Sequence, residues 1–180
     1  MLNDEELYSR YLDGDNDAID ELLVRHKEGL IWFLFGVVHN MDDAEDLMMD
    51  TFALLLTKHL KFKNNSSFKT WLYGIGRNLA SNYIRKKKSD LTDDIEQYEL
   101  PESVSEGSTA FLEKERNNEL YHALGKLPAD YAEVLYLLYF AEMSVEEAAK
   151  VMKRSAKQIY NLTERAKNKL KELMNEYIYP

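Results

Sequence analysis

The sequence predicts an all-α fold of two small helical domains joined by a flexible acidic linker. Its 180 residues include only three prolines and seven glycines, and they are rich in residues that favour helices, such as Leu, Glu, Lys and Ala. Apolar residues recur at spacings of three and four along most of the chain. Residues 89–109 lose this period, because they are polar, acidic and interrupted by Pro101 and Gly107.

The first domain is expected to contain four helices. Residues 4–13 form a short helix, and a longer one follows from 18 to about 38. A third helix begins at Asn40 and runs to about Leu60. The polar segment KFKNNSS, residues 61–67, is expected to be a loop, and the fourth helix runs from 68 to about 88.

The second domain is expected to begin with helices over 110–124 and 127–140. Residues 144–171 then read as two helices joined by a tight turn, each with its own capping box: a serine followed three residues later by Glu or Gln. The second of these helices has an apolar sector opposite a polar one. A short capped helix, a turn and a longer helix with a hydrogen-bonding face predict a helix-turn-helix.

Charge is distributed unevenly along a chain of net charge −9. Residues 58–88 carry nine Lys and Arg and no acid, whereas 90–106 carry seven acids and no base. Between Lys150 and Lys171, eight cations stand against Glu164 alone. Two basic surfaces separated by an acidic connector suggest two contacts on one polyanion.

Several function classes find no support in the sequence. The chain has no cysteine, which excludes disulfides, thiolate zinc sites and cysteine nucleophiles and agrees with a cytosolic location. No long apolar run or signal-like start is present, so neither membrane insertion nor secretion is expected. Four scattered histidines and no phosphate-binding loop argue against an enzyme, and no catalytic residue, metal or cofactor is expected.

The third helix combines a broad apolar face with an acidic one formed by Asp42, Asp43, Asp46 and Asp50. A metal site is disfavoured, because bundle sites add a histidine three residues after an inward-pointing glutamate. Two interpretations stay open: a solvated face, or a docking face for a basic partner helix with Met49 exposed among the acids.

The loop 61–67 and the fourth helix interleave aromatic, basic, Asn and Ser residues, a composition suited to single-stranded nucleic acid. Trp71 and Tyr83 also fit a packing role, and for Trp71 the core is favoured over contact with a ligand.

A series of short motifs runs through the chain in a fixed order. They are Gly14-Asp15, Ala18, Arg25-His26, Asp43 to Leu47, Asp50, Phe52, Phe62, Ser67-Phe68, Trp71-Leu72, Arg77 to Ala80, Leu127-Pro128, Ser144, Glu147 to Ala149, Ser155, Ile159 and Arg165 to Lys167. With these residues the chain resembles, over almost its whole length, the extracytoplasmic-function (ECF) sigma factors, the compact two-domain sigma subunits of bacterial RNA polymerase.

The resemblance implies a role for each group of residues. Docking on polymerase core is assigned to the third helix, at Glu45, Asp46, Met49 and Asp50. Capture and melting of the minus-ten element are assigned to Lys61, Asn64, Asn65, Ser66, Ser67, Arg77, Asn78, Asn82, Arg85 and Lys86. Recognition of the minus-thirty-five element is assigned to Lys153, Arg154, Ser155, Lys157, Gln158, Tyr160, Asn161 and Arg165.

The resemblance also implies domain boundaries and partners. Residues 1–88 correspond to sigma domain two, 89–109 to the linker and 110–180 to sigma domain four. The implied partners are the largest-subunit coiled coil and the flap of polymerase core, promoter DNA both as duplex and as melted non-template strand, and an anti-sigma factor. A helix-turn-helix regulator that acts without being a polymerase subunit is the alternative.

Four departures from the family pattern affect these assignments. Met49 stands where the family usually has Gln, and Lys153 occupies a turn position often held by Gly, where a left-handed backbone is costly for other residues. Tyr160 replaces a common Lys, and Lys157-Gln158 replace Gly-Thr, so promoter specificity cannot be copied from relatives.

Overall fold

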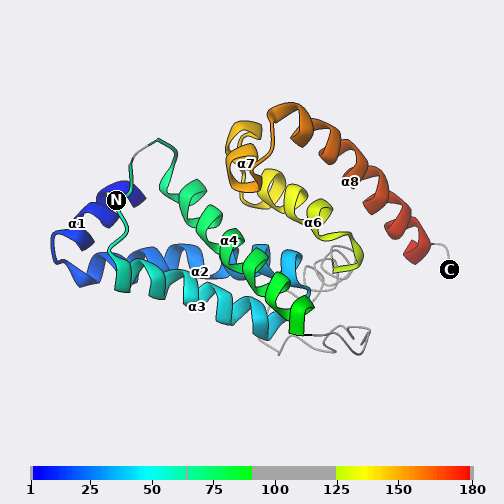
Figure 1. Cartoon of the computed structure of the whole chain (residues 1–180). Coiled ribbons are helices and arrows are strands. Elements are labelled where there is room, and N and C mark those ends of the chain that lie inside the picture. The colour runs from blue at the N-terminus through cyan, green and yellow to red at the C-terminus, as the bar shows by residue number, and fades with distance from the viewer. Residues whose placement is uncertain (1, 64, 91–124, 179–180) are drawn as a thin grey trace.

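Helices account for every regular element of the described chain. The first domain contains α1 (Asp4–Leu12), α2 (Asn16–Val38), α3 (Met41–Lys58) and α4 (Phe68–Asp90). The second contains α6 (Ala129–Leu135), η1 (Tyr136–Phe140), α7 (Val145–Met152) and α8 (Ala156–Ile178). This computed structural model describes residues 2–63, 65–90 and 125–178 (Figure 1). Within these ranges the predicted all-α fold is confirmed.

Two of the predicted segments cannot be compared with the structure. The helix expected over 110–124 and all but the start of the linker expected over 89–109 lie outside the described residues.

The centre of the first domain is α2, which contacts α1, α3 and α4. Its leucines Leu22, Leu30 and Leu34 are fully buried. Gly76 of α4 allows a close crossing, because a Cβ at this position would lie 3.1 Å from Leu30 Cδ1 and 3.4 Å from Thr51 Oγ1. The glycine therefore serves helix packing.

Two histidines with left-handed backbone end α2 and α3, which the sequence did not predict. His39 has φ of 56° and His59 has φ of 42°. Their backbone N–H groups donate to the carbonyls of Phe35 and Leu55 at 2.8 and 3.1 Å. Glycine usually takes this position at helix ends, since other residues pay a steric penalty there.

The helix-turn-helix has the capping pattern predicted from sequence. Ser144 Oγ accepts the N–H of Glu147 at 3.2 Å, and the Glu147 carboxylate accepts the N–H of Ser144 at 3.0 Å. Ser155 and Gln158 make the same reciprocal bonds at 3.2 and 2.8 Å. Lys153 lies in the turn with φ of 54°, so it adopts the left-handed backbone expected at this position.

The helix predicted over 127–140 differs from the expectation in its last third. From Tyr136 to Phe140 the backbone is a π-helix, in which the N–H of Ala141 donates to the Tyr136 carbonyl at 2.9 Å. Val134 and Leu137 are fully buried. Hydrophobic spacing does not distinguish a wider helical turn at the end of an α-helix, so the π-helix could not be predicted from it.

The two domains pack against each other, and the sequence did not predict this interface. Helix α6 and η1 contact α2, while α7 contacts α4. The rings of Phe33 and Tyr136 lie 6.1 Å apart across the boundary. Gly36 of α2 faces α6, where an added Cβ would lie 3.5 Å from the Cβ of Ala132. In the described parts of the chain, no helix combines the length and apolar character that crossing a membrane requires.

Candidate polymerase and nucleic-acid surfaces

An exposed acidic face runs along α3. Glu45, Asp46 and Asp50 are exposed, and Met49 between them is 57% exposed, whereas the opposite face is buried in the domain core. An exposed methionine among carboxylates suits a partner that is both apolar and basic. No three His, Asp or Glu side chains in the described ranges are grouped as metal ligands.

The loop between α3 and α4 and the second half of α4 present the residues assigned to the minus-ten element. Lys61, Lys63 and Asn65 are exposed, and Ser66 and Ser67 are half-buried. Asn64 lies outside the described residues. Four of the assigned side chains on α4, which together are called the α4 stripe, are exposed: Asn78, Asn82, Arg85 and Lys86.

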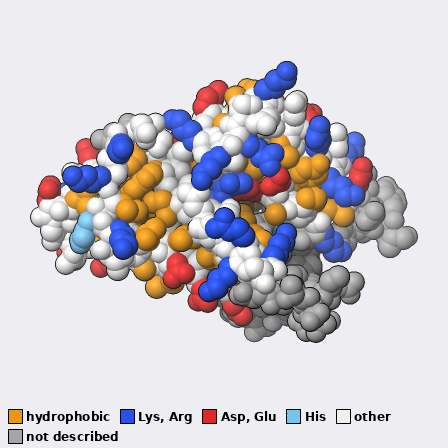
Figure 2. Space-filling view, in the orientation of Figure 1, with side chains coloured by type: hydrophobic (Ala, Val, Ile, Leu, Met, Phe, Trp, Pro, Cys, Tyr) orange, Lys and Arg blue, Asp and Glu red, His pale blue; other side chains and the backbone are white. Residues whose placement is uncertain are grey.

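Cations also gather on this side of the molecule, where Figure 2 shows Lys and Arg side chains over the region of α4 and of α7. Within the α4 stripe, the Arg85 guanidinium donates to the Asn82 side chain at 3.1 Å. This surface can follow a phosphate backbone while offering amide groups to bases.

Aromatic rings pack behind the loop. Trp71 is half-buried, with its ring 5.2 Å from Phe62, 5.4 Å from Tyr8 and 5.8 Å from Phe68. The favoured packing role of Trp71 agrees with these contacts. Tyr83 is also half-buried, and burial, reinforced by the nearby Asp43 carboxylate, raises the pKa of its hydroxyl.

Arg77 is bound by the second domain rather than open to solvent. Its Nε donates to Glu133 Oε1, and its Nη2 donates to Oε2 at 3.3 Å. Glu133 is only 2% exposed, so this ion pair between α4 and α6 lies inside the interface of the two domains. Burial raises the pKa of the Glu133 carboxyl, and the Arg77 guanidinium opposes that rise.

A second set of polar contacts joins the candidate loop to α7. The hydroxyls of Ser67 and Thr70 donate to Glu147 Oε1 at 2.9 and 3.0 Å. Lys150 Nζ donates to the Asn65 carbonyl at 2.8 Å. Partial burial would raise the pKa of Glu147, but hydrogen bonds from Ser144, Ser67 and Thr70 outweigh it and lower the pKa. Glu147 therefore serves the capping box and the interface together.

The same junction contains a groove of about 390 Å³ between the domains. Its polar and basic lining is made up of Asn65, Ser66, Thr70, Asn78, Lys150 and Lys153. Residues assigned to the minus-ten element and one assigned to the minus-thirty-five element thus face one cavity.

The outer face of α8 presents most residues assigned to the minus-thirty-five element. Lys157, Gln158, Asn161 and Arg165 are exposed, and Tyr160 is 60% exposed. On the inner face, Ile159, Leu162 and Ala166 are buried, as the predicted apolar sector requires.

Three further predicted residues lie in the turn before α8. Lys153 and Ser155 are exposed, whereas Arg154 is half-buried and its Nη2 donates to Asp130 of α6. The side-chain oxygen of Gln158 accepts the Ser155 N–H, which leaves its NH₂ group available to a ligand.

Sequence reasoning missed Glu133 and the second role of Glu147. The one available signal for Glu133 was an acidic residue inside the apolar stretch Tyr131 to Leu138, where a charge needs a partner. Nothing in local spacing identified that partner as Arg77, which is 56 residues away.

Comparison with known proteins agrees with this geometry. The family model described as Sigma-70 region 2 matches residues 22–89, and the one described as Sigma-70, region 4 matches residues 117–170. The ECF sigma factor SigM of Bacillus subtilis is 30% identical over 88% of this chain and 96% of its own. The ECF sigma factor EcfG of Rhodopseudomonas palustris is 32% identical over 88% and 86%.

A solved structure with the same fold is the sigma factor RpoE of Bartonella quintana in complex with the anti-sigma factor NepR. It matches with a TM-score of 0.71 and 26% identity over 87% of this chain and 96% of that one. Sigma factors are initiation factors without enzymatic activity, and they bind RNA polymerase and promoter DNA. The chain belongs to the ECF sigma factors and directs promoter-specific initiation of transcription by RNA polymerase.

Proposed function

We propose that this sigma factor acts in the cytoplasm through three surfaces that divide the work of initiation. The acidic face of α3, formed by Glu45, Asp46, Met49 and Asp50, docks on polymerase core. The loop and the α4 stripe take the minus-ten element, and the outer face of α8 takes the minus-thirty-five element. The domains would span 1–88 and 110–180, joined by the linker 89–109.

The assignment of the α3 face rests on its separation from the core packing. A face used only for solubility would not need an exposed methionine between three carboxylates, because exposed apolar area costs solubility without stabilising the fold. Since Met49 replaces the usual Gln, its contact with core would be made by packing rather than by an amide hydrogen bond.

The observation that carries the proposal furthest is the contact between the proposed minus-ten surface and the second domain. Ser67 and Arg77, both assigned to the minus-ten element, give their donors to Glu147 and Glu133 of the second domain. A donor used inside the protein cannot bind a phosphate or base at the same time. The described arrangement is therefore a closed form, which must open before both promoter elements are bound.

A closed form gives an anti-sigma factor a simple way to act, namely to bind across both domains and keep them together. The Bartonella quintana relative was solved with an anti-sigma factor. We extend that kind of partner to this chain, with the closed form as its binding-competent state.

Run-off transcription with reconstituted holoenzyme tests the function of the α3 face. Asp46→Lys is expected to reduce the run-off product by at least tenfold, because a cation would face the basic partner helix at the docking surface. Binding of duplex promoter DNA by the free protein should not change. Glu28→Lys, a charge reversal at an exposed position of α2, is the matched control and should transcribe normally.

The opposite pattern would contradict the proposal. If Asp46→Lys transcribes as well as Glu28→Lys, the acidic face of α3 is not the docking surface. The closed form would be contradicted if the free wild-type protein bound the promoter as tightly and as sequence-specifically as the holoenzyme does.

A further inference from the structure

Helix α1 contacts both ends of the segment that connects α3 to α4. At one end, the Tyr8 hydroxyl donates to the Leu60 carbonyl at 2.6 Å. At the other end, the backbone N–H of Phe68 donates to Glu5 Oε1 at 2.7 Å. Helix α1 precedes residues 22–89, so it lies outside the part of the chain that the Sigma-70 region 2 model matches.

Glu5 satisfies a backbone group that α4 cannot satisfy itself. Phe68 is the first residue of α4, and the first N–H groups of a helix have no partner within the helix. A carboxylate at this point also lies at the positive end of the helix dipole. The bond therefore fixes the point at which the loop ends and α4 begins.

Tyr8 holds the other end of the loop from a buried position. It is 1% exposed, and burial, with a smaller effect of Tyr11, raises its pKa to about 12, so the hydroxyl stays protonated and donates. Its ring lies 5.2 Å from Phe68 and 5.4 Å from Trp71. Through Trp71 this packing reaches Phe62 inside the loop.

The helix that makes these contacts is itself anchored to α2. Asp4 accepts from Arg25 at 2.9 Å, and its other oxygen lies 2.6 Å from His26 Nε2. Asn3 and Glu6 close a capping box at the start of α1. Because α2 is the centre of the domain, its contacts with α1 fix the ends of the loop relative to the domain core.

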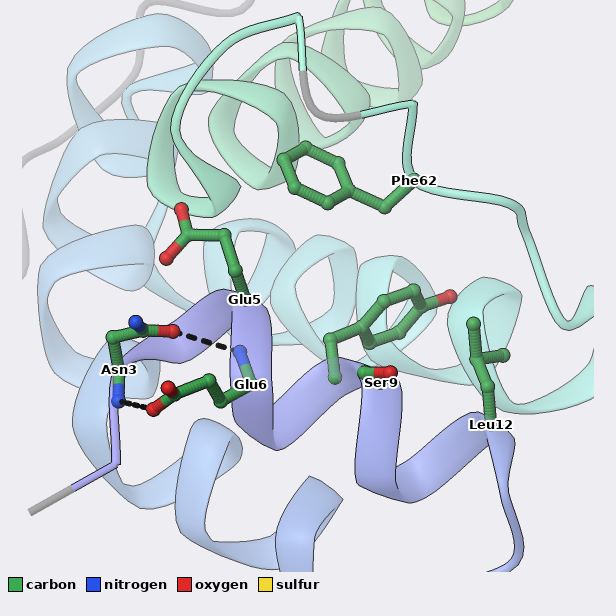
Figure 3. A pocket seen from close by; sticks show the side chains of 7 residues that line it. Asn3, Glu5, Glu6, Ser9, Leu12 and Phe62 are labelled. Atoms are coloured by element: carbon green, nitrogen blue, oxygen red, sulfur yellow. Dashed lines mark hydrogen bonds between the residues drawn. The ribbon is translucent and has the colours of Figure 1, made fainter.

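The loop has room to move if these contacts are lost. Figure 3 shows a pocket between α1 and Phe62, with Glu5 and Ser9 on one wall and Phe62 on the other. Its volume is about 320 Å³, and Leu12 also lines it. Phe62 is therefore not held by close packing on this side. Within the first domain, the hydrogen bonds of Tyr8 and Glu5 hold the two ends of the loop, whereas its bonds from Lys150 and to Glu147 come from the second domain.

We infer that Glu5 and Tyr8 are positioning residues for minus-ten recognition, which hold the 61–67 loop in the shape that receives a base. The inference rests on the proposed function, because that function assigns the loop to the minus-ten element. Tyr8 is too buried to touch DNA, and the Glu5 carboxylate would repel phosphate. Both would act through the loop.

The test uses holoenzyme reconstituted with the full-length protein and a promoter library randomised across the minus-ten element. Tyr8→Phe removes only the hydroxyl, and we expect the preference for the favoured base to fall about fivefold, the loss typical of one neutral hydrogen bond. Tyr11→Phe is the matched control, since its hydroxyl donates to the Leu56 carbonyl inside α3 at 3.3 Å. Its base preference should equal that of the wild type.

A second pair of variants protects the test against simple misfolding. Glu5→Ala should lower base preference, whereas Glu5→Gln keeps an oxygen for the Phe68 N–H and should restore most of it. Affinity for core polymerase should not change in any variant. Unchanged base preference in Tyr8→Phe, or a uniform loss of transcription with the preference intact, would overturn the inference.

Variants of the loop itself distinguish this inference from the function it depends on. Asn65→Ala and Ser66→Ala should change base preference if the loop binds the minus-ten element. If they do not, the proposed function of the loop fails. If they do and Tyr8→Phe does not, only the positioning role of α1 fails.

Discussion

The buried ion pair between Arg77 and Glu133 gives a direct test of the closed form. Glu133→Gln keeps the shape of the side chain but leaves the Arg77 charge without a counter-ion in the interface. Glu133 belongs to no proposed DNA or polymerase surface, so the substitution leaves all assigned contacts intact. The substitution destabilises the closed form alone, because in the open form Arg77 is exposed to water and its charge needs no counter-ion.

The size of the effect follows from burial. Breaking a fully buried pair by removing one partner costs about 3–5 kcal/mol. The Arg77 side chain is 17% exposed, so partial hydration lowers the expected cost to about 2–3 kcal/mol. At 1.4 kcal/mol per factor of ten, the ratio of open to closed protein should rise by about 30- to 150-fold.

Two measurements report this shift. Because the chain has no cysteine, spin labels can be attached through Glu28→Cys and Asn168→Cys, exposed positions on α2 and α8. Glu133→Gln should broaden the distribution of distances between the labels. It should also strengthen binding of the free protein to single-stranded minus-ten DNA, measured by fluorescence anisotropy, by up to the same factor.

Glu146→Gln is the matched control, since it removes an exposed carboxylate from the same domain. The closed form would be refuted if Glu133→Gln and Glu146→Gln gave the same narrow distance distribution as the wild type. A broadened distribution without stronger DNA binding would show that the interface opens but does not mask the minus-ten surface.

Two further predictions concern the left-handed residues. Burial lowers the pKa of His39, whose Nδ1 is buried without a hydrogen-bond partner among the described residues. The unfolded chain therefore takes up the proton of this histidine first as pH falls below about 6.5. The urea concentration at the unfolding midpoint should decrease when the pH is lowered from 7.5 to 5.5, and it should decrease less in His39→Asn, since asparagine tolerates φ of 56°. A pH dependence that His39→Asn leaves unchanged would exclude this histidine as a cause. Lys153→Gly should raise the free energy of unfolding by about 0.5 kcal/mol, because the relief of left-handed strain exceeds the effect of the added entropy of the unfolded chain. The control Lys157→Gly in α8 should lower the free energy of unfolding by about 1 kcal/mol. Equal losses of stability for the two variants in denaturant titrations would show that the backbone at Lys153 carries no strain.

Local signals in the sequence predicted the helices and the turn of the helix-turn-helix because their causes are local. A capping box needs only residues three apart, and Ser144 with Glu147 forms one in the structure. The left-handed Lys153 was also predictable, since the turn between two helices requires that backbone whichever residue occupies it. The left-handed backbone of His39 and His59 was not predictable, because a histidine at the end of a helix does not by itself indicate that conformation.

The interface could not be predicted, because its partners lie far apart in the chain. Arg77 and Glu133 are separated by 56 residues, and Ser67 and Glu147 by 80. Each residue also has a sufficient local explanation: Arg77 as one cation in a basic helix, Glu147 as part of a capping box. A pattern that already has a local cause gives no reason to look for a distant one.

The donors that meet carboxylates in the closed form are the donors that a polyanion would need. Arg77 offers a guanidinium and Ser67 a hydroxyl, and Glu133 and Glu147 occupy them as phosphate oxygens would. If Ser67 and Arg77 bind the minus-ten element as proposed, DNA has to compete with two carboxylates tethered in the same chain, and we expect promoter binding by the free protein to be weak. Docking on core polymerase can remove this competition only if the docked state holds the two domains apart. The separation of the α3 face from the interface allows such docking to occur before the domains part.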